Sequence, residues 1–246
     1  MLALTVLSPH RDDAAFSLCL ALSRWSKLKV PITVVNFFTI SSYAPQSSVT
    51  AISEVSSLRE KEDRLALSSI NSQIRIEALC LLDAPIRLNI SAASISAPEN
   101  AQLQPAGEIE SLTRQMQARS AYRLVLAPLA LGNHVDHQAV HSAATRAYSG
   151  QRLGFYEDLP YATWTSAEEL AVRVAAAEGA THVSLRPVVI GISSEAVSRK
   201  LRVVSRYRSQ INRQEAITIA RHAGRYGGGE RIWIPKHGKL WRTLLS

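Results

Sequence analysis

Metal-binding side chains are concentrated in a short segment near the start of the chain. Pro9 is followed by His10, Arg11, Asp12 and Asp13. Two adjacent carboxylates repel each other unless a cation neutralises them, and imidazole with carboxylate is a ligand set that suits zinc. This segment alone is equally consistent with a helix N-terminus at which one aspartate caps the helix. The metal interpretation therefore depends on ligands elsewhere in the chain.

A second group of polar side chains, His134, Asp136 and His137, lies more than a hundred residues later. One histidine can bind a metal while the other acts on a substrate, and the aspartate between them can orient a histidine. A helix start capped by Asp136 is the alternative for this segment alone. Together the two segments supply enough ligands for one metal site, which favours a shared site. His141 is expected on the helix surface or behind the ligands.

The elements that must position these groups follow from the hydrophobic pattern. β-branched and apolar runs predict strands, and segments with helical spacing predict helices between them. Their alternation predicts an α/β fold, a Rossmann-like three-layer αβα sandwich with a mostly parallel sheet. The predicted strands are 2–7, 32–40, 76–82, 123–127, 153–156, 183–192 and 231–234, and the predicted helices are 14–25, 51–70, 108–119, 137–148, 167–178 and 197–210.

The predicted strand ends bring the polar groups together. In doubly wound folds the functional site lies beyond the carboxyl ends of the parallel strands. The segment 10–13 follows the first strand, Asp83 follows the third, and 134–137 follows the fourth. We therefore expect three loops to converge on one site. The Ser/Ala/Pro-rich segment 86–105 is expected to be a long loop, and loops of this length often act as lids.

Two signatures in this chain resemble those of the PIG-L (LmbE-like) deacetylases. SPHRDDAAFSL resembles the family's Pro-His-x-Asp-Asp signature, and GNHVDHQAV resembles its His-x-Asp-His signature. SLREKEDRLAL matches the family's Arg-x-x-Glu-x-x-x-Ala helix at Arg59, Glu62 and Ala66. YEDLPYA and KLRVVSRYRSQ are also similar to segments of these proteins. The resemblance covers residues 1 to about 235, and the two signatures occur in the family's order.

The resemblance implies a ligand set and a catalytic pair. His10, Asp13 and His137 match the residues that hold Zn2+, although another divalent metal could occupy such a site. Asp12 matches the general base that activates the attacking water. His134 matches the histidine that polarises the amide oxygen or protonates the leaving amine.

Further positions follow from the same resemblance. Asp136 matches the carboxylate that supports a neighbouring histidine, and we expect it to favour the charged form of His134. Arg59 and Asp83 match positions that face the substrate in some members. Each of these roles is an expectation about one side chain at one position of this sequence.

The chain departs from the family pattern at two positions. Arg11 stands where many members have proline, and Ala14 stands where many have glutamate. Arg11 is either a solvent-facing arginine or a cation that favours an anionic substrate, so we treat it as a candidate substrate-binding residue. Neither departure removes a ligand, but the loss of a carboxylate at Ala14 affects which substrate the site would accept.

The implied reaction is zinc-dependent hydrolysis of an N-acyl amide, in particular an N-acetyl group on a small amino sugar or glycoconjugate. It would release a carboxylate and a free amine. One alternative is an amidase that acts on a non-sugar natural product or a thiol conjugate, because the metal ligands do not distinguish these substrates. A different class of alternative is a catalytically inactive protein or a basic nucleic-acid-binding protein.

Composition limits the remaining classes. The 246 residues include 46% hydrophobic and 20% charged residues, which predicts a single globular domain over 1–246. Aromatic residues make up only 6%, so the formal charge of +8 is interpreted as a solvated surface rather than a specific nucleic-acid site.

Cys19 and Cys80 are expected to be buried thiols. No apolar run is long enough to span a membrane, and the N-terminus does not resemble a signal peptide, so a cytoplasmic location is expected. The sequence is also compatible with a homo-oligomer.

Overall fold

The strands of this protein form one central sheet. Within the residues that the computed structural model describes, 2–97, 106–118, 124–148 and 150–245, seven strands lie in the order β3-β2-β1-β4-β5-β7-β6. They are β1 (Leu4–Ser8), β2 (Ile32–Ile40), β3 (Arg75–Leu82), β4 (Leu124–Pro128), β5 (Leu153–Tyr156), β6 (Leu185–Ile190) and β7 (Glu230–Pro235). The first five strands are parallel, and β7 is antiparallel to its neighbours β5 and β6. The predicted α/β fold with a mostly parallel sheet is confirmed.

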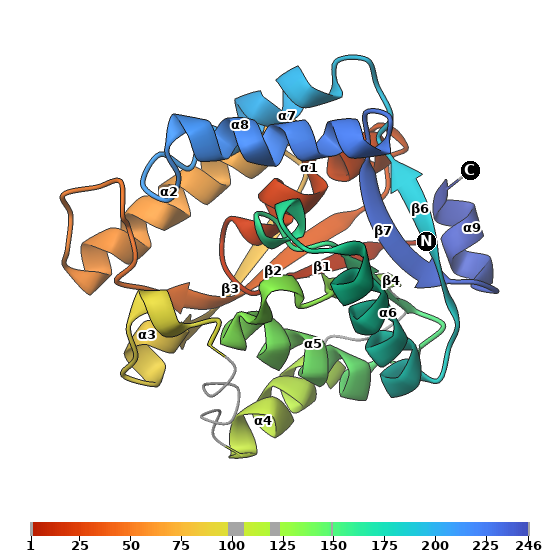
Figure 1. Cartoon of the computed structure of the whole chain (residues 1–246), viewed down its shortest axis with the longest axis horizontal. Helices are drawn as coiled ribbons and strands as arrows, with labels where there is room; N and C mark the ends of the chain where they lie inside the picture. Colours follow the sequence, from red (N-terminus) through yellow and green to blue (C-terminus); the bar gives the residue numbers. More distant parts are fainter. Residues whose placement is uncertain (1, 98–105, 119–123, 149, 246) are drawn as a thin grey trace.

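Helices cover both faces of the sheet (Figure 1). One layer contains α1 (Asp13–Lys27), α2 (Ile52–Ile70), α7 (Ala196–Val204) and α8 (Arg213–His222). The other contains α4 (Ala106–Gln117), α5 (Val135–Ala147) and α6 (Ala167–Thr181). Because both faces are covered, every residue of β1, β4 and β5 is buried, and these strands have continuous apolar sequences.

The C-terminal part of the chain differs most from the sequence-based expectation. The helix predicted over 197–210 ends at Val204, and α8 begins after Asn212. The Asn212 side chain accepts a hydrogen bond from the Glu215 N–H, and the Glu215 side chain accepts one from the Asn212 N–H. This Asn-x-x-Glu spacing is a recognisable helix start, so the sequence contained a signal for α8. A last helix, α9 (Lys239–Leu245), also lies in a segment without a predicted element.

The expected long loop 86–105 contains short helices in its described part. Helix α3 (Ala84–Arg87) ends within it, and the 3-10 helix η1 (Ala92–Ser94) follows. Residues 98–105 of that segment lie outside the described residues, as do 119 and 123 at the ends of a predicted helix and a predicted strand. An interpretation of the whole segment as a lid therefore stays a prediction.

The two cysteines have different environments. Cys19 is buried as expected, but Cys80 is exposed, so the expectation for Cys80 was wrong. Cys80 lies in β3, which is an edge strand with alternating exposure rather than an inner strand buried on both faces.

In the described part of the chain, no helix is long and apolar enough to cross a membrane. The assignment of residues 1–246 to a single domain stays a prediction.

Candidate active site

The three predicted metal ligands converge at the carboxyl end of the sheet. His10 lies in the turn from β1 to α1, Asp13 begins α1, and His137 lies in the first turn of α5. One donor atom from each of these residues lies within 4.8 Å of the other two. One carboxylate oxygen of Asp13 is 3.3 Å from Nδ1 of His10 and 3.3 Å from Nε2 of His137. This arrangement could hold one metal ion with a position left open.

A carboxylate lies behind each imidazole of this cluster. Nε2 of His10 is 2.9 Å from Oδ2 of Asp136, and Nδ1 of His137 is 2.6 Å from Oδ1 of Asp158. Carboxylates in such positions fix the orientation of metal-binding histidines and increase their basicity. Asp136 therefore supports a histidine, as expected, but that histidine is His10. Asp158 was not among the predicted site residues, although it lies within the YEDLPYA segment.

A second set of donors, His10, His134 and Asp136, also lies within 4.8 Å. The Asp136 carboxylate already contacts Arg87 at 2.9 Å and accepts a hydrogen bond from the Ala84 N–H. Asp136 is fully buried and does not line the adjacent cavity, whereas His10, Asp13 and His137 do. The first set is therefore the better candidate metal centre.

The cluster concentrates positive charge on its histidines. Burial lowers the pKa of His10, but the Asp13 and Asp136 carboxylates outweigh burial and raise it to about 9. Burial likewise opposes the charge on His137, but Asp13 and Asp158 raise its pKa to about 10. Burial acts to raise the pKa of Asp13, but the two histidines hold it far below its usual range. A divalent cation would supply positive charge at the same place and release these protons.

His134 is placed beside the metal cluster rather than among its ligands. Its ring lies 4.8 Å from that of His10 and 4.9 Å from that of His137. Burial and these two neighbouring rings lower the pKa of His134 well below its usual value. The Asp136 and Asp13 carboxylates favour the charged form of His134, but burial and the two rings outweigh them, so the expected increase in the pKa of His134 is wrong.

A hydrogen bond determines which His134 nitrogen carries the proton. Nδ1 of His134 accepts a hydrogen bond from the Asp136 N–H, at 3.1 Å, and so caps α5. A ring nitrogen that accepts cannot also carry hydrogen, so the proton of the neutral ring lies on Nε2. His134 lines the cavity and can offer a hydrogen-bond donor there.

A cavity of about 180 Å³ opens in front of the cluster. Asp12, Arg59 and Asp83 line it, and their roles toward a substrate stay predictions. Arg59 lies 3.5 Å from an oxygen of Asp12 and donates a hydrogen bond to Ser41 Oγ, so it holds Asp12 beside the metal cluster. Arg11 does not line this cavity. It is buried and lies 3.3 Å from Glu60.

Comparisons with known proteins place the chain in a family. Residues 5–148 match the family described as PIG-L, GlcNAc-PI de-N-acetylase. The chain is also 31% identical over 231 residues to 2'-N-acetylparomamine deacetylase from Streptomyces fradiae, which covers 93% of this chain and 80% of that relative. The chain belongs to the PIG-L family. The resemblance that its sequence motifs indicate is therefore confirmed, as is its class, a hydrolase of N-acyl amides.

Solved structures support the fold of this PIG-L chain. Teicoplanin deacetylase Orf2 in its zinc-inhibited form has a TM-score of 0.68 at 22% identity, over 95% of this chain and 97% of that chain. N,N'-diacetylchitobiose deacetylase from Pyrococcus horikoshii has a TM-score of 0.60 at 16% identity, over 95% of this chain and 84% of that chain.

The Arg-x-x-Glu helix of the PIG-L chain holds one part of the cavity wall, around Gln210. Glu62 accepts hydrogen bonds from the N–H and the hydroxyl of Ser209, at 2.8 and 2.7 Å. Because the Ser209 hydroxyl donates to Glu62, its oxygen must accept from the Gln210 amide. The Gln210 amide also donates to the Tyr43 carbonyl. Both hydrogen bonds use the nitrogen of the Gln210 amide as donor. Oε1 of Gln210 therefore points away from Ser209 and Tyr43, and its orientation as a hydrogen-bond acceptor is fixed.

The next residue of the same helix, Asp63, is a buried carboxyl that supports this wall from behind. It accepts hydrogen bonds from the Tyr207 hydroxyl at 3.0 Å and from the Asn36 amide at 2.8 Å. Burial raises its pKa to about 7, and these two hydrogen bonds only partly oppose burial. Within the part of the chain that the structure describes, the buried Oδ1 of Asn36 has no hydrogen-bond partner. Neither Asp63 nor Gln210 was among the predicted site residues.

Proposed function

We propose that this protein is a metal-dependent N-deacetylase that hydrolyses the N-acetyl group of an amino sugar or glycoconjugate. The observation that carries the proposal is the convergence of His10, Asp13 and His137 on one cavity, with a carboxylate behind each imidazole. Membership of the PIG-L family supports the same reaction class.

The donor set fits a zinc ion. Two imidazole nitrogens and one carboxylate oxygen are typical ligands of a catalytic zinc site, which leaves a position for water or substrate. When bound, the metal would act as a Lewis acid and lower the pKa of the water that attacks the amide. The ligands would be His10, Asp13 and His137. We propose zinc as the bound metal because of these ligand types. The same atoms could hold another divalent metal.

Asp12 is the proposed general base. It lines the cavity next to Asp13 and is held by Arg59 at 3.5 Å. Asp12 takes a proton from the attacking water as oxygen bonds to the amide carbon. When the carbon–nitrogen bond breaks, Asp12 returns this proton to the nitrogen, so the products are acetate and a free amine.

His134 is the proposed donor to the amide oxygen. Its Nδ1 accepts from the backbone, so Nε2–H is the atom available to the substrate. A donor that is already oriented stabilises the negative charge that develops on the oxygen during attack. In this proposal His134 acts as a neutral donor, and Asp136 and Asp158 act only by orienting the ligands His10 and His137.

The charge of the cavity supports an amino sugar that carries further protonated amines. The protein as a whole has a formal charge of +8, yet the described lining of this cavity includes the carboxylates of Asp12, Asp83 and Glu215 in addition to Asp13, beside the Arg59 guanidinium and the histidines of the metal cluster. Clefts lined by one sign of charge concentrate ligands of the opposite sign. Oε1 of Gln210 adds an acceptor for a hydroxyl or an ammonium group. The Streptomyces fradiae relative is named for an N-acetylated aminoglycoside precursor, which fits the same substrate class.

A substrate panel tests the proposal. The zinc-loaded protein would be incubated with 2'-N-acetylparomamine, N-acetylglucosamine, N,N'-diacetylchitobiose and a non-sugar acetamide, and both acetate and free amine would be measured. We expect equal amounts of the two products, with the highest rate on the sugar that carries additional amines. Metal-loaded, folded protein that releases acetate from none of the sugars would contradict the proposal.

The proposal also includes the expectations from the sequence about cellular location, partners and oligomeric state. A protein that acts on small biosynthetic intermediates fits a cytoplasmic location and needs neither a membrane span nor a specific nucleic acid. A homo-oligomer is compatible with the sequence, and light scattering during gel filtration would measure the oligomeric state.

A further inference from the structure

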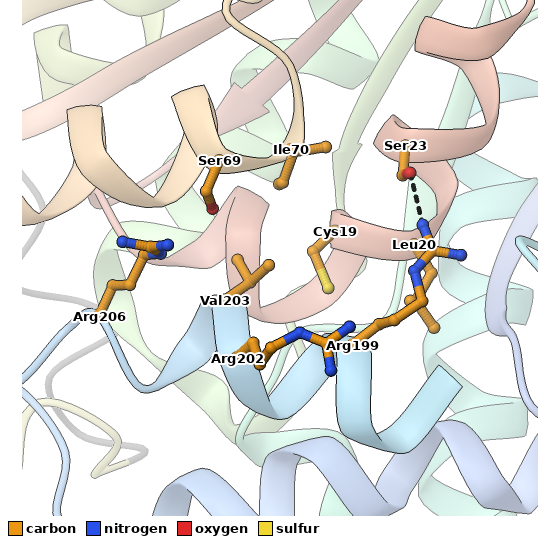
Figure 2. Close-up of a pocket in the computed structure, with 9 residues that line it drawn as sticks. All are labelled: Cys19, Leu20, Ser23, Ser69, Ile70, Arg199, Arg202, Val203 and Arg206. Carbon is orange, nitrogen blue, oxygen red and sulfur yellow. Dashed lines mark hydrogen bonds between the residues drawn. The ribbon is translucent and has the colours of Figure 1, made fainter. Parts of the chain in front are cut away.

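A second cavity, of about 220 Å³, lies between α1, the end of α2 and α7. Figure 2 shows its arginines along the α7 side, with small polar side chains facing them from α1 and α2. Arg199, Arg202 and Arg206 line it, together with the hydroxyls of Ser23 and Ser69. None of the residues that line this cavity is acidic.

The charges of these arginines are not neutralised by the described part of the protein. Arg199 donates a hydrogen bond of 2.7 Å to Ser23 Oγ, which is a neutral acceptor. Among the described residues, neither Arg202 nor Arg206 forms an ion pair. The adjacent Lys200 is bonded to Glu230 at 2.6 Å, so this buried pair contributes no compensating negative charge. The cavity is therefore lined by three positive charges that form no ion pair among the described residues, with Arg202 and Arg206 exposed to water and Arg199 partly buried.

The spacing of the arginines makes this arrangement unfavourable without an anion. Arg199 and Arg202 are three positions apart on α7, where like charges destabilise a helix, and Arg206 follows just beyond the end of α7 at Val204. Guanidinium groups match the oxygens of phosphate, to which they donate strong charge-assisted hydrogen bonds. The cavity of about 220 Å³ has room for a phosphate group and part of its hydration.

We propose that this cavity binds the phosphate group of a small molecule, either free phosphate or a phosphate ester. The proposal concerns a site that is separate from the metal cluster and does not depend on the proposed deacetylation. A small anion fits better than a nucleic acid because α1 and α2 enclose the cavity opposite the arginines. In addition, no aromatic side chain lines it on which a base could stack.

Calorimetric titration with inorganic phosphate and with ribose 5-phosphate tests this proposal. The metal-loaded protein is used at an ionic strength held constant with sodium chloride, and the titration is repeated after chelation to detect phosphate bound at the metal. The test variant is Arg202→Gln/Arg206→Gln. The control variant, Arg221→Gln/Arg242→Gln, removes the same charge from positions that are exposed, as Arg202 and Arg206 are, but that do not line the cavity.

We expect saturable binding of both probes, weakened at least about tenfold in the test variant and unchanged in the control variant and after chelation. If phosphate binds and ribose 5-phosphate does not, the occupant is free phosphate. The proposal is overturned if neither probe binds, if the two variants bind equally, or if chelation removes binding. Binding of a single-stranded oligonucleotide without saturable binding of either probe would also overturn it, in favour of a nucleic-acid surface. Circular dichroism of both variants would establish that each is folded.

Discussion

Nδ1 of His137 lies 2.6 Å from an oxygen of Asp158, and both side chains are almost completely buried. The two residues are 21 positions apart, on α5 and on the segment after β5. The contact turns Nε2 of His137 toward Asp13. Asp158 also accepts a hydrogen bond from the Leu131 N–H, so it is itself held in position.

Replacement of Asp158 with asparagine is expected to weaken metal binding by about 10–100-fold, because the variant lacks the negative charge that increases the basicity of His137. Competition with a chelator of known affinity would measure the change. The matched control is Glu157→Gln, because Glu157 contacts Arg231 and Tyr226 rather than the metal cluster. Equal metal affinity in the Asp158→Asn protein and the wild type would contradict the proposed role.

Asp12→Asn is expected to lower kcat by about a hundredfold to ten-thousandfold and to leave the metal content unchanged. The physical reason is that an amide cannot accept the proton of the attacking water, whereas the three ligands are intact. Metal analysis and free-amine release would be measured on the same preparation. Loss of the metal from this variant would instead identify Asp12 as a ligand.

Removal of the metal by a chelator is expected to abolish turnover and to lower the midpoint of thermal unfolding. A metal that binds only the folded state stabilises it by mass action. Addition of zinc should restore both properties, and calorimetry with and without chelator would measure the midpoint. The His10→Ala protein provides the control, since its midpoint should respond much less to chelation.

Gln210→Leu is expected to raise KM more than it lowers kcat, because Gln210 lines the cavity and in our proposal its Oε1 binds the substrate away from the reacting bond. Glu62→Gln should have a similar effect, since Glu62 holds Ser209 and through it Gln210. Steady-state kinetics on the preferred substrate would separate the two parameters. An unchanged KM in Gln210→Leu, with wild-type stability, would remove Gln210 from the substrate site.

Asp63 is expected to make folding stability fall as the pH rises from about 4 to about 7. Its pKa is raised to about 7 by burial, despite hydrogen bonds from Tyr207 and Asn36 and the nearby positive charge of Arg11, and Asp12 raises it further. Between these pH values the folded state keeps a proton that the unfolded chain has lost, so deprotonation favours unfolding.

In Asp63→Asn this decline should be smaller, because no proton is bound at this position. The Asn36 amide can then turn so that its unpartnered oxygen accepts from the new amide. Urea unfolding at a series of pH values would compare the two proteins. Parallel stability curves for the two proteins would exclude Asp63 as the source.

The sequence predicted the fold and the metal cluster because both leave strong local signals. His10 and Asp13 follow one mostly apolar strand, and His137 follows another. The rule that sites lie beyond the carboxyl ends of parallel strands was therefore enough to predict that the three residues meet. Asp158 and Gln210 have no such signal. Their roles arise from contacts with residues far along the chain, and a single buried carboxylate or amide is not distinguishable from other polar residues in a sequence.

The errors have similar physical causes. Cys80 was assigned to the core because its neighbours are apolar, but only the order of the strands reveals that β3 lies at an edge. The charge on His134 was assigned from its neighbour Asp136, yet burial and the rings of His10 and His137 outweigh that carboxylate. Arg11 pairs with Glu60 on α2, which no local pattern could indicate.

The metal cluster and one part of the cavity wall come from different stretches of the chain. His10, Asp13 and His137 all lie within the family match of residues 5–148, whereas Gln210 and Glu215 follow it. Mutations in the later stretch can therefore remodel the substrate wall without altering a metal ligand. Selection could change the accepted sugar while the hydrolytic centre is inherited unaltered. A chimera that exchanges the segment around Gln210 between two relatives would then acquire the donor's preference at nearly full catalytic rate.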